Sequence, residues 1–101
     1  MSEQMKTLRG IAHHLDSVVT ISEKGTNSLN IEEIDRALHD HELIKIKLSI
    51  LDRILRKKTG DEIARTTNSV VVKRIGKTVV LYRKNASVKP RLSNIHRYKT
   101  V

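Results

Sequence analysis

The sequence predicts a single α/β domain of two layers, in which a four-stranded mixed sheet packs against three helices in the order αβαβαββ. Three observations predict this fold class. The chain has 101 residues, enough for one hydrophobic core. Three stretches with apolar residues at helical spacing alternate with short β-branched runs. Strands that alternate with helices need crossover connections, which favour mostly parallel pairing, and a final hairpin adds an antiparallel edge.

The first helix is predicted over residues 5–15, because apolar residues recur there at spacings of three and four: Met5, Leu8, Ile11, Ala12 and Leu15. Residues 17–21 form a short β-branched run, typical of a buried strand. Asn27 is a suitable N-cap for a second helix, which begins at Leu29 or Asn30 and ends at Leu38.

Residues 43–50 alternate as a half-buried strand does, with Ile44, Ile46, Leu48 and Ile50 on one face. Lys45 and Lys47 lie on the other face, which is therefore cationic. We expect the helices chiefly on the isoleucine side, so that the lysine face is left to solvent or ligand. A third helix is predicted over residues 52–67, with Asn68 as a left-handed C-terminal cap.

Two β-branched runs, residues 69–75 and 78–83, are separated by Gly76 and Lys77. A two-residue loop with glycine first predicts a type II′ hairpin. After Asn85 the chain is basic and has little periodicity. The sequence therefore predicts a folded domain over residues 1–85 and a flexible basic tail over residues 86–101.

The net charge of +9 is unevenly distributed. Residues 1–51 carry 6 basic and 8 acidic side chains, whereas residues 52–101 carry 14 basic and 3 acidic ones. This asymmetry indicates a polyanionic partner, nucleic acid ahead of anionic lipid. Phe and Trp are absent, and Tyr82 and Tyr98 are the two tyrosines, so a surface that stacks several bases on aromatic rings is excluded. We expect contacts to phosphate, backbone and 2′-hydroxyl groups instead.

Catalytic and metal-binding patterns are weak. Gly76-Lys77-Thr78 resembles the end of a phosphate-binding Walker loop, but Val71 occupies the place of the upstream glycine and a strand follows. His39 and His41 alternate at a helix end and have no third ligand nearby in the sequence. We therefore expect no catalytic residues, no metal and no cofactor. With no cysteine, no long apolar run and no signal-peptide pattern, a cytoplasmic protein without membrane contact is expected.

The loop of residues 22–25 precedes a helix, where backbone N–H groups and the helix dipole favour phosphate. Together with the open strand face, the third helix and the hairpin, it defines the candidate phosphate-binding residues: Lys24, Gly25, Lys45, Lys47, Arg53, Arg56, Lys57, Lys58, Lys73, Lys77, Arg83 and Lys84. Tyr82 is a candidate for a single stacking contact.

Four segments carry a family pattern: LRGIAHHL at residues 8–15, Val18-Val19, HELIKIK at residues 41–47 and IGKTVVLYR at residues 75–83. In this order and spacing they resemble the bacterial YhbY-type CRM family, the chloroplast RNA splicing and ribosome maturation domain. The resemblance covers about residues 4–85. It implies an RNA-binding fold similar to the C-terminal domain of translation initiation factor three.

The resemblance also implies a function. Bacterial members look like assembly factors that associate with precursors of the large ribosomal subunit, so ribosomal RNA is the implied partner. The family has a phosphate-facing GxxG turn after the first strand. Here this turn reads Ser22-Glu23-Lys24-Gly25, so a serine replaces the first glycine and Glu23 adds a negative charge. We expect a monomeric RNA-binding protein without catalysis.

Two alternatives remain at this point. The first is a DNA-binding or nucleoid protein, in which the same cations contact duplex DNA. The second is an RNA-processing enzyme that uses His13, His14 or His41 as acid–base groups.

Overall fold

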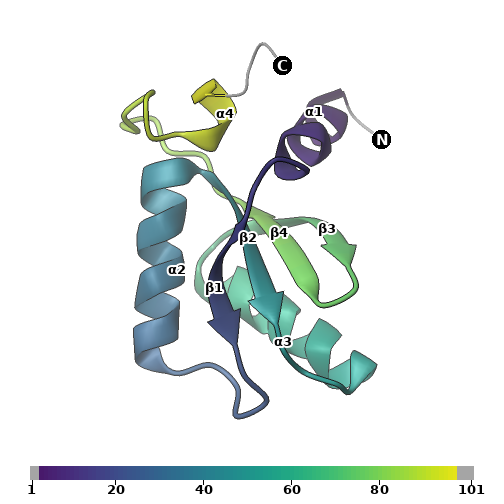
Figure 1. The fold of residues 1–101 in the computed structure, drawn as a ribbon. Helices are drawn as coiled ribbons and strands as arrows, with labels where there is room; N and C mark the ends of the chain where they lie inside the picture. Colours follow the sequence, from purple (N-terminus) through teal and green to yellow (C-terminus); the bar gives the residue numbers. More distant parts are fainter. Residues whose placement is uncertain (1–2, 98–101) are drawn as a thin grey trace.

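Four strands form one sheet in the computed structural model, which describes residues 3–97 (Figure 1). The strands are β1 (Ser17–Ile21), β2 (Leu43–Leu48), β3 (Val70–Ile75) and β4 (Thr78–Tyr82). The helices are α1 (Glu3–Ala12), α2 (Ser28–His41), α3 (Arg53–Thr66) and a short α4 (Asn94–Arg97). The predicted order αβαβαββ and the mixed sheet are confirmed, and α4 follows them without a signal in the sequence pattern.

The strand order is β1-β2-β4-β3, and the expectation of mostly parallel pairing is wrong. Only β1 and β2 pair in parallel, whereas β4 runs antiparallel to both β2 and β3. The crossover helices do give β1, β2 and β3 one common direction, but β4 inserts between β2 and β3. Burial explains this position, because Val79, Val80 and Leu81 are all buried in β4, whereas β3 carries Lys73 and Arg74 at the edge.

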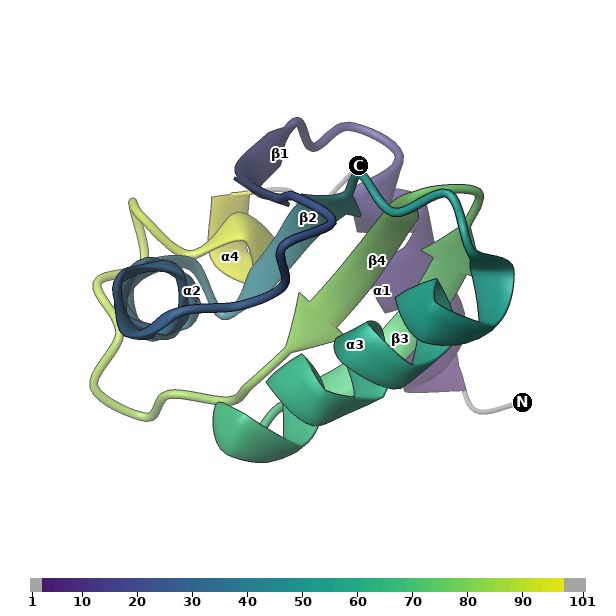
Figure 2. The ribbon, with the colours of Figure 1, turned by 90° about the horizontal axis from the view of Figure 1, so that it is seen from below.

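Helices α2 and α3 cover one face of the sheet, as expected (Figure 2). The core on this face is aliphatic and unites both helices with all four strands. Its members include Ile21 of β1, Ile34 and Leu38 of α2, Ile44 and Ile46 of β2, Ile63 of α3 and Leu81 of β4. The alternation of β2 therefore places its isoleucines as predicted.

The opposite face is only partly open, which corrects the expectation that it is left to solvent or ligand. Helix α1 packs on it with Leu8, Ile11 and Ala12, against Leu43 of β2 and Val80 of β4. Ile95 of α4 packs against the same cluster. The apolar side of α1 needs a partner, and the lysine face of β2 begins with a leucine, so α1 covers that end. Lys47, farther along β2, is exposed.

The predicted caps and the two-residue hairpin loop of Gly76 and Lys77 are confirmed. The side chain of Asn27 accepts a hydrogen bond from the backbone N–H of Asn30 at 2.9 Å. Asn68 has a left-handed φ of 55° just after α3, and Gly76 has a φ of 54° in the hairpin loop. Helix α2 extends three residues beyond the predicted end, to His41, because the apolar spacing stops at Leu38 while the backbone continues.

Glu42 ends α2 with a left-handed φ of 62°, and its side chain joins the C-terminal segment to the sheet. The carboxylate is buried and accepts hydrogen bonds from the backbone N–H of Asn85 and from Ser93 Oγ, each at 2.8 Å. Asn94 Nδ2 donates to the carbonyl oxygen of Leu43 at 2.7 Å. Part of the predicted tail thus packs on the domain. How mobile residues 86–97 are in solution stays a prediction, and residues 98–101 lie outside the described residues.

Candidate nucleic-acid interface

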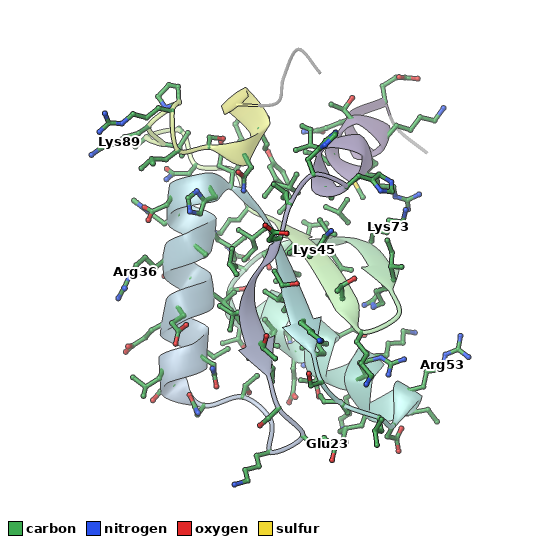
Figure 3. The ribbon with its side chains drawn as sticks, in the orientation of Figure 1. Glu23, Arg36, Lys45, Arg53, Lys73 and Lys89 are labelled. Carbon is green, nitrogen blue, oxygen red and sulfur yellow. The ribbon has the colours of Figure 1, made fainter. Side chains whose placement is uncertain are left out.

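The lysine face beside α1 and beyond it, which we call the open face, carries three of the predicted lysines: Lys45, Lys47 and Lys73. Val80, which lies between Lys45 and Lys73, is buried under α1. The strand register aligns Lys45 with Val80 and Val80 with Lys73, so the two lysines lie two strands apart on one face. At a strand spacing of about 4.8 Å, that is roughly 10 Å. Figure 3 labels Lys45 over β2 and Lys73 near the β3 edge. Three lysines within this area can reach phosphates of one nucleic-acid backbone.

Lys47 extends the open face toward the carboxyl end of β2. The register pairs it with Thr20 of β1 and Thr78 of β4, so two threonines flank Lys47 on neighbouring strands. No strand of the sheet carries an aspartate or glutamate. The open face therefore has cationic and hydroxyl groups, the side chains that contact phosphate oxygens in protein–nucleic acid complexes.

A second cationic surface lies on the other side of the sheet, in an open groove of about 1110 Å³ between α3 and the β3–β4 hairpin. We call it the α3 groove. Its lining has six cationic side chains and one carboxylate: Arg53, Arg56, Lys57, Lys58, Arg65, Arg74 and Asp61. All four predicted cations of α3 therefore lie in it.

The carboxylate in the α3 groove is already paired, because Asp61 accepts from Arg74 in an ion pair. Arg56 Nη1 donates to the carbonyl oxygen of Ile50 at 2.8 Å. Arg53, Lys57 and Lys58 lie in no ion pair within the part of the chain that the structure describes. The groove thus keeps a clear excess of positive charge for an anionic ligand.

Sequence reasoning missed two cations of the α3 groove, Arg65 and Arg74. Arg65 lies eight residues after Lys57, about two turns along the same side of the helix, so helical spacing could have found it. Arg74 lies next to Lys73, but it has the opposite orientation across the pleat. Only the packing of α3 against the hairpin brings it into the groove.

The loop of residues 22–25 is a tight turn beside the start of α3. The N–H of Gly25 donates to the carbonyl oxygen of Ser22 at 2.9 Å, and Gly25 has a φ of 87°, which favours glycine. The carboxylate of Glu23 accepts from the backbone N–H of Leu51 at 3.2 Å. Glu23 is therefore directed to the β2–α3 loop, and Lys24 is the exposed cation of the turn.

The remaining predicted residues lie apart from these two surfaces or between them. Lys77 is exposed at the hairpin turn, where the two sides of the sheet meet, and its carbonyl oxygen accepts from Leu48 N–H. Arg83 is half-buried and forms an ion pair with Asp35 at 2.6 Å. Lys84 is exposed beyond β4. Seven of the twelve predicted residues thus lie on the open face or in the α3 groove, and the other five lie outside both surfaces: Lys24, Gly25, Lys77, Arg83 and Lys84.

Tyr82 lies in the α1 side of the core and not on the open face. It packs against the cluster of Leu8, Ile11 and Val80. Burial raises the pKa of its phenol, and the negative charge of Glu42 raises it further. The Tyr82 ring thus contributes to packing. With no other aromatic ring on the two surfaces within residues 3–97, contacts to phosphate are their main chemistry.

The histidines considered for acid–base catalysis lie away from the α3 groove. His41 Nδ1 donates to the carbonyl oxygen of Leu92 at 2.6 Å, whereas His13 and His14 are exposed after α1. Across residues 3–97, no three His, Asp or Glu side chains are grouped closely enough to hold a metal ion. None of the helices described is long and apolar enough to cross a bilayer.

The chain is similar to known proteins over most of its length. Residues 1–83 match the family described as the CRS1 / YhbY (CRM) domain. The chain is 42% identical over 96 residues to a Pseudomonas aeruginosa protein named "Probable RNA-binding protein PA4753", covering 95% of this chain and 92% of that protein. It is 37% identical over 91 residues to a Haemophilus influenzae "RNA-binding protein", covering 90% of this chain and 92% of the relative.

A solved structure has the same fold. The solution structure of SAV1595 from Staphylococcus aureus, described as a candidate RNA-binding protein, superposes with a TM-score of 0.75 at 30% sequence identity. The match covers 84% of this chain and 88% of that protein. The architecture of sheet and helices is therefore shared with that protein.

Proposed function

Because this chain belongs to the CRS1 / YhbY (CRM) domain family, we propose that it is an RNA-binding protein with no catalytic activity of its own. The observation that carries the proposal is the excess of cations on the open face and in the α3 groove, most of which form no ion pair within residues 3–97. Cations and hydroxyl groups without a stacking platform favour contacts to phosphate and ribose. Such contacts suit folded RNA, whose bases are largely paired.

The proposed target is ribosomal RNA in precursors of the large ribosomal subunit, where the protein acts as an assembly factor in the cytoplasm. The resemblance to YhbY-type proteins supports this role. The charge distribution supports it too, since a net charge of +9 on 101 residues favours a large polyanion. We propose that the protein acts as a monomer.

The test is sucrose-gradient fractionation of a native lysate, with the protein followed by immunoblot at low and at moderate salt. Co-migration with large-subunit precursors, weakened by the higher salt, is the expected result, because phosphate contacts release counterions. Protein that stays at the top of the gradient under both conditions would contradict the ribosomal role.

Two binding and activity assays address the alternatives. Matched RNA and DNA duplexes are compared at physiological salt, and equal affinity would favour a DNA-binding protein. Labelled precursor RNA is incubated with the protein for a long period, and intact RNA is expected. Cleavage products that disappear in the His13→Ala, His14→Ala or His41→Ala variant would instead identify an RNA-processing enzyme.

A further inference from the structure

The two cationic surfaces lie on opposite sides of one sheet, and we propose that the protein holds two RNA segments at once, one on each surface. This inference rests on the proposed RNA binding. It adds a bridging activity, by which two RNA helices that are not base-paired to each other are kept together.

The β3–β4 hairpin separates the two surfaces. Lys73 is paired with Val80 on the side of the open face, and the next residue, Arg74, is paired with Val79 on the side of the α3 groove. Successive residues of a strand point to opposite faces, so these two cations cannot contact the same face of a ligand. The same holds for β2, where Lys45 is on the open face and Ile46 packs in the core under α3.

A rigid duplex that lies on one surface cannot reach the other. The sheet stands between the surfaces, and α3, with a diameter of about 10 Å, packs on only one side of it. Lys77 at the hairpin turn is the predicted cation placed where the two sides meet. A single strand could follow this edge from one side to the other, but two duplexes would each occupy one surface.

Both surfaces carry cations that form no ion pair within residues 3–97. On the open face, no strand supplies a carboxylate to Lys45, Lys47 or Lys73. In the α3 groove, Asp61 is paired with Arg74, while Arg53 and Lys57 lie four residues apart on the helix. Like charges at this spacing destabilise a helix. A polyanion bound in the groove would therefore reduce the repulsion between these side chains and stabilise α3.

On the α2 side of the described residues, carboxylates offset the positive charge. Helix α2 carries the exposed carboxylates Glu32, Glu33 and Asp35 on the remaining side. Figure 3 labels Arg36 and Lys89 on the α2 side of the molecule, away from the open face and from Arg53. Removing these two charges therefore gives a matched control that leaves both proposed surfaces intact.

The experiment is a sandwich assay with two RNA duplexes that cannot pair with each other. One duplex carries biotin and is held on beads, the other carries a fluorophore, and the protein is kept below the RNA concentration. Binding to each duplex alone is measured in parallel. Three variants are compared with the wild-type protein: Lys45→Gln with Lys47→Gln on the open face, Lys57→Gln with Lys58→Gln in the groove, and Arg36→Gln with Lys89→Gln as the control.

The wild-type protein and the control variant are expected to retain the fluorescent duplex on the beads. Each single-surface variant is expected to keep binding one duplex. The amount of fluorescent duplex that it retains on the beads should fall about tenfold, because two phosphate contacts are removed from one side. A dimer that carried one RNA per protomer would lose bridging in one of the two variants only, so loss of bridging in both variants also excludes a dimer as the bridge.

Other outcomes would overturn the proposal. Wild-type protein that binds each duplex but retains no second duplex would limit the chain to one RNA and leave the proposed function intact. A groove variant that binds and bridges as the wild type does would assign the groove to a partner other than RNA, such as an acidic protein segment. Protein that binds neither duplex would contradict RNA binding itself.

Discussion

Two adjacent cations, Arg83 and Lys84, have different surroundings although both are candidates from the sequence. Arg83 Nη1 contacts the carboxylate of Asp35 at 2.6 Å and donates to the carbonyl oxygen of Thr67 at 2.9 Å. Its Nη2 donates to the carbonyl oxygen of Asp35 at 3.0 Å. Arg83 thus ties the end of β4 to α2 and to the end of α3, while Lys84 is exposed.

We therefore expect Arg83→Ala to lower the free energy of unfolding by about 1–2 kcal/mol, because half-buried hydrogen bonds of a charged group are lost. The loss is no larger because Asp35 is largely exposed and its ion pair is screened by solvent. The Lys84→Ala variant is the matched control, with a change of less than about 0.5 kcal/mol. Urea unfolding followed by circular dichroism measures both. Equal stabilities would show that the Arg83 contacts do not stabilise the fold.

The burial of Tyr82 makes the stability of the fold depend on pH. Burial raises the pKa of its phenol above the ordinary 10.0, and the carboxylate of Glu42 raises it further. Because the folded state favours the neutral phenol, the stability that this contributes is complete below about pH 10 and is lost as the pH rises through the raised pKa. The folded protein should therefore unfold more readily in strong alkali.

The chain has two tyrosines and no tryptophan, so Tyr98→Phe leaves Tyr82 as the single phenol in an absorbance titration. The expected midpoint of this titration lies above pH 10, and unfolding in urea should return it to the ordinary value. A midpoint at or below the value in urea would contradict the burial of Tyr82.

Helix α3 is weakened by its own sequence, because Gly60 lies in its interior. Gly60 is buried, and a Cβ atom there would meet side-chain carbons of Leu48 and Val79 at 3.5 Å, an ordinary van der Waals distance. The sequence pattern indicates the weak point, but only the packing shows that an alanine fits.

Gly60→Ala is therefore expected to raise the free energy of unfolding by about 0.5–1 kcal/mol, the helix propensity difference between the two residues. Ala64→Gly, on the same buried side of α3, is the reverse control and should destabilise the protein by at least that amount. Thermal and urea unfolding measure both variants. A Gly60→Ala protein less stable than the wild type would mean that the helix lies too close to the sheet for a methyl group.

The C-terminal segment is an element whose hydrogen bonds run to the domain. Ser93 and Asn94 are buried, and they contact Glu42 and the backbone of Leu43. Ile95 adds apolar contact to the α1 side of the core. These contacts predict that residues 92–95 contribute to stability even though the predicted domain ends at residue 85.

Deletion of residues 86–101 is expected to lower the free energy of unfolding by about 2–3 kcal/mol, because two buried hydrogen bonds are lost and Glu42 loses the partner Ser93 Oγ. Amide exchange at Asn85, whose N–H donates to the Glu42 carboxylate, should become faster. Unchanged stability and exchange would instead support a segment that is detached in solution, in agreement with the predicted flexible tail.

At the scale of the whole molecule, the fold places acidic and basic side chains on different sides. Exposed carboxylates such as Glu32 and Glu33 lie on α2, whereas seven of the predicted cations lie on the open face or along α3. A polyanion is therefore attracted to the sheet and α3 and repelled from α2.

The salt dependence of RNA affinity measures this division. Each neutralised phosphate contributes about 0.7–0.9 to the slope of log affinity against log salt concentration, so Lys45→Gln with Lys47→Gln should make the slope shallower by about 1.5. Glu32→Gln with Glu33→Gln should change the affinity by less than the open-face variant does. An open-face variant with the wild-type slope would place the RNA elsewhere.

Local features are what the sequence by itself determines in this protein. The caps at Asn27 and Asn68 and the turn at Gly76 follow from backbone preferences of single residues, and the helices and strands follow from apolar periodicity. The lysine face of β2 and the cations of α3 are likewise visible in the sequence, because alternation and helical spacing depend only on residues close in the chain. The family segments indicate the same fold.

Only the tertiary structure decides which elements meet. The insertion of β4 between β2 and β3, the cover of α1 over Leu43 and the ion pair of Arg83 with Asp35 join residues far apart in the sequence. The tertiary structure also places the predicted cations on two sides of the sheet and brings Arg74 into the α3 groove. The physical reason is that such contacts are selected by the total apolar surface buried in the whole fold, which no local pattern contains.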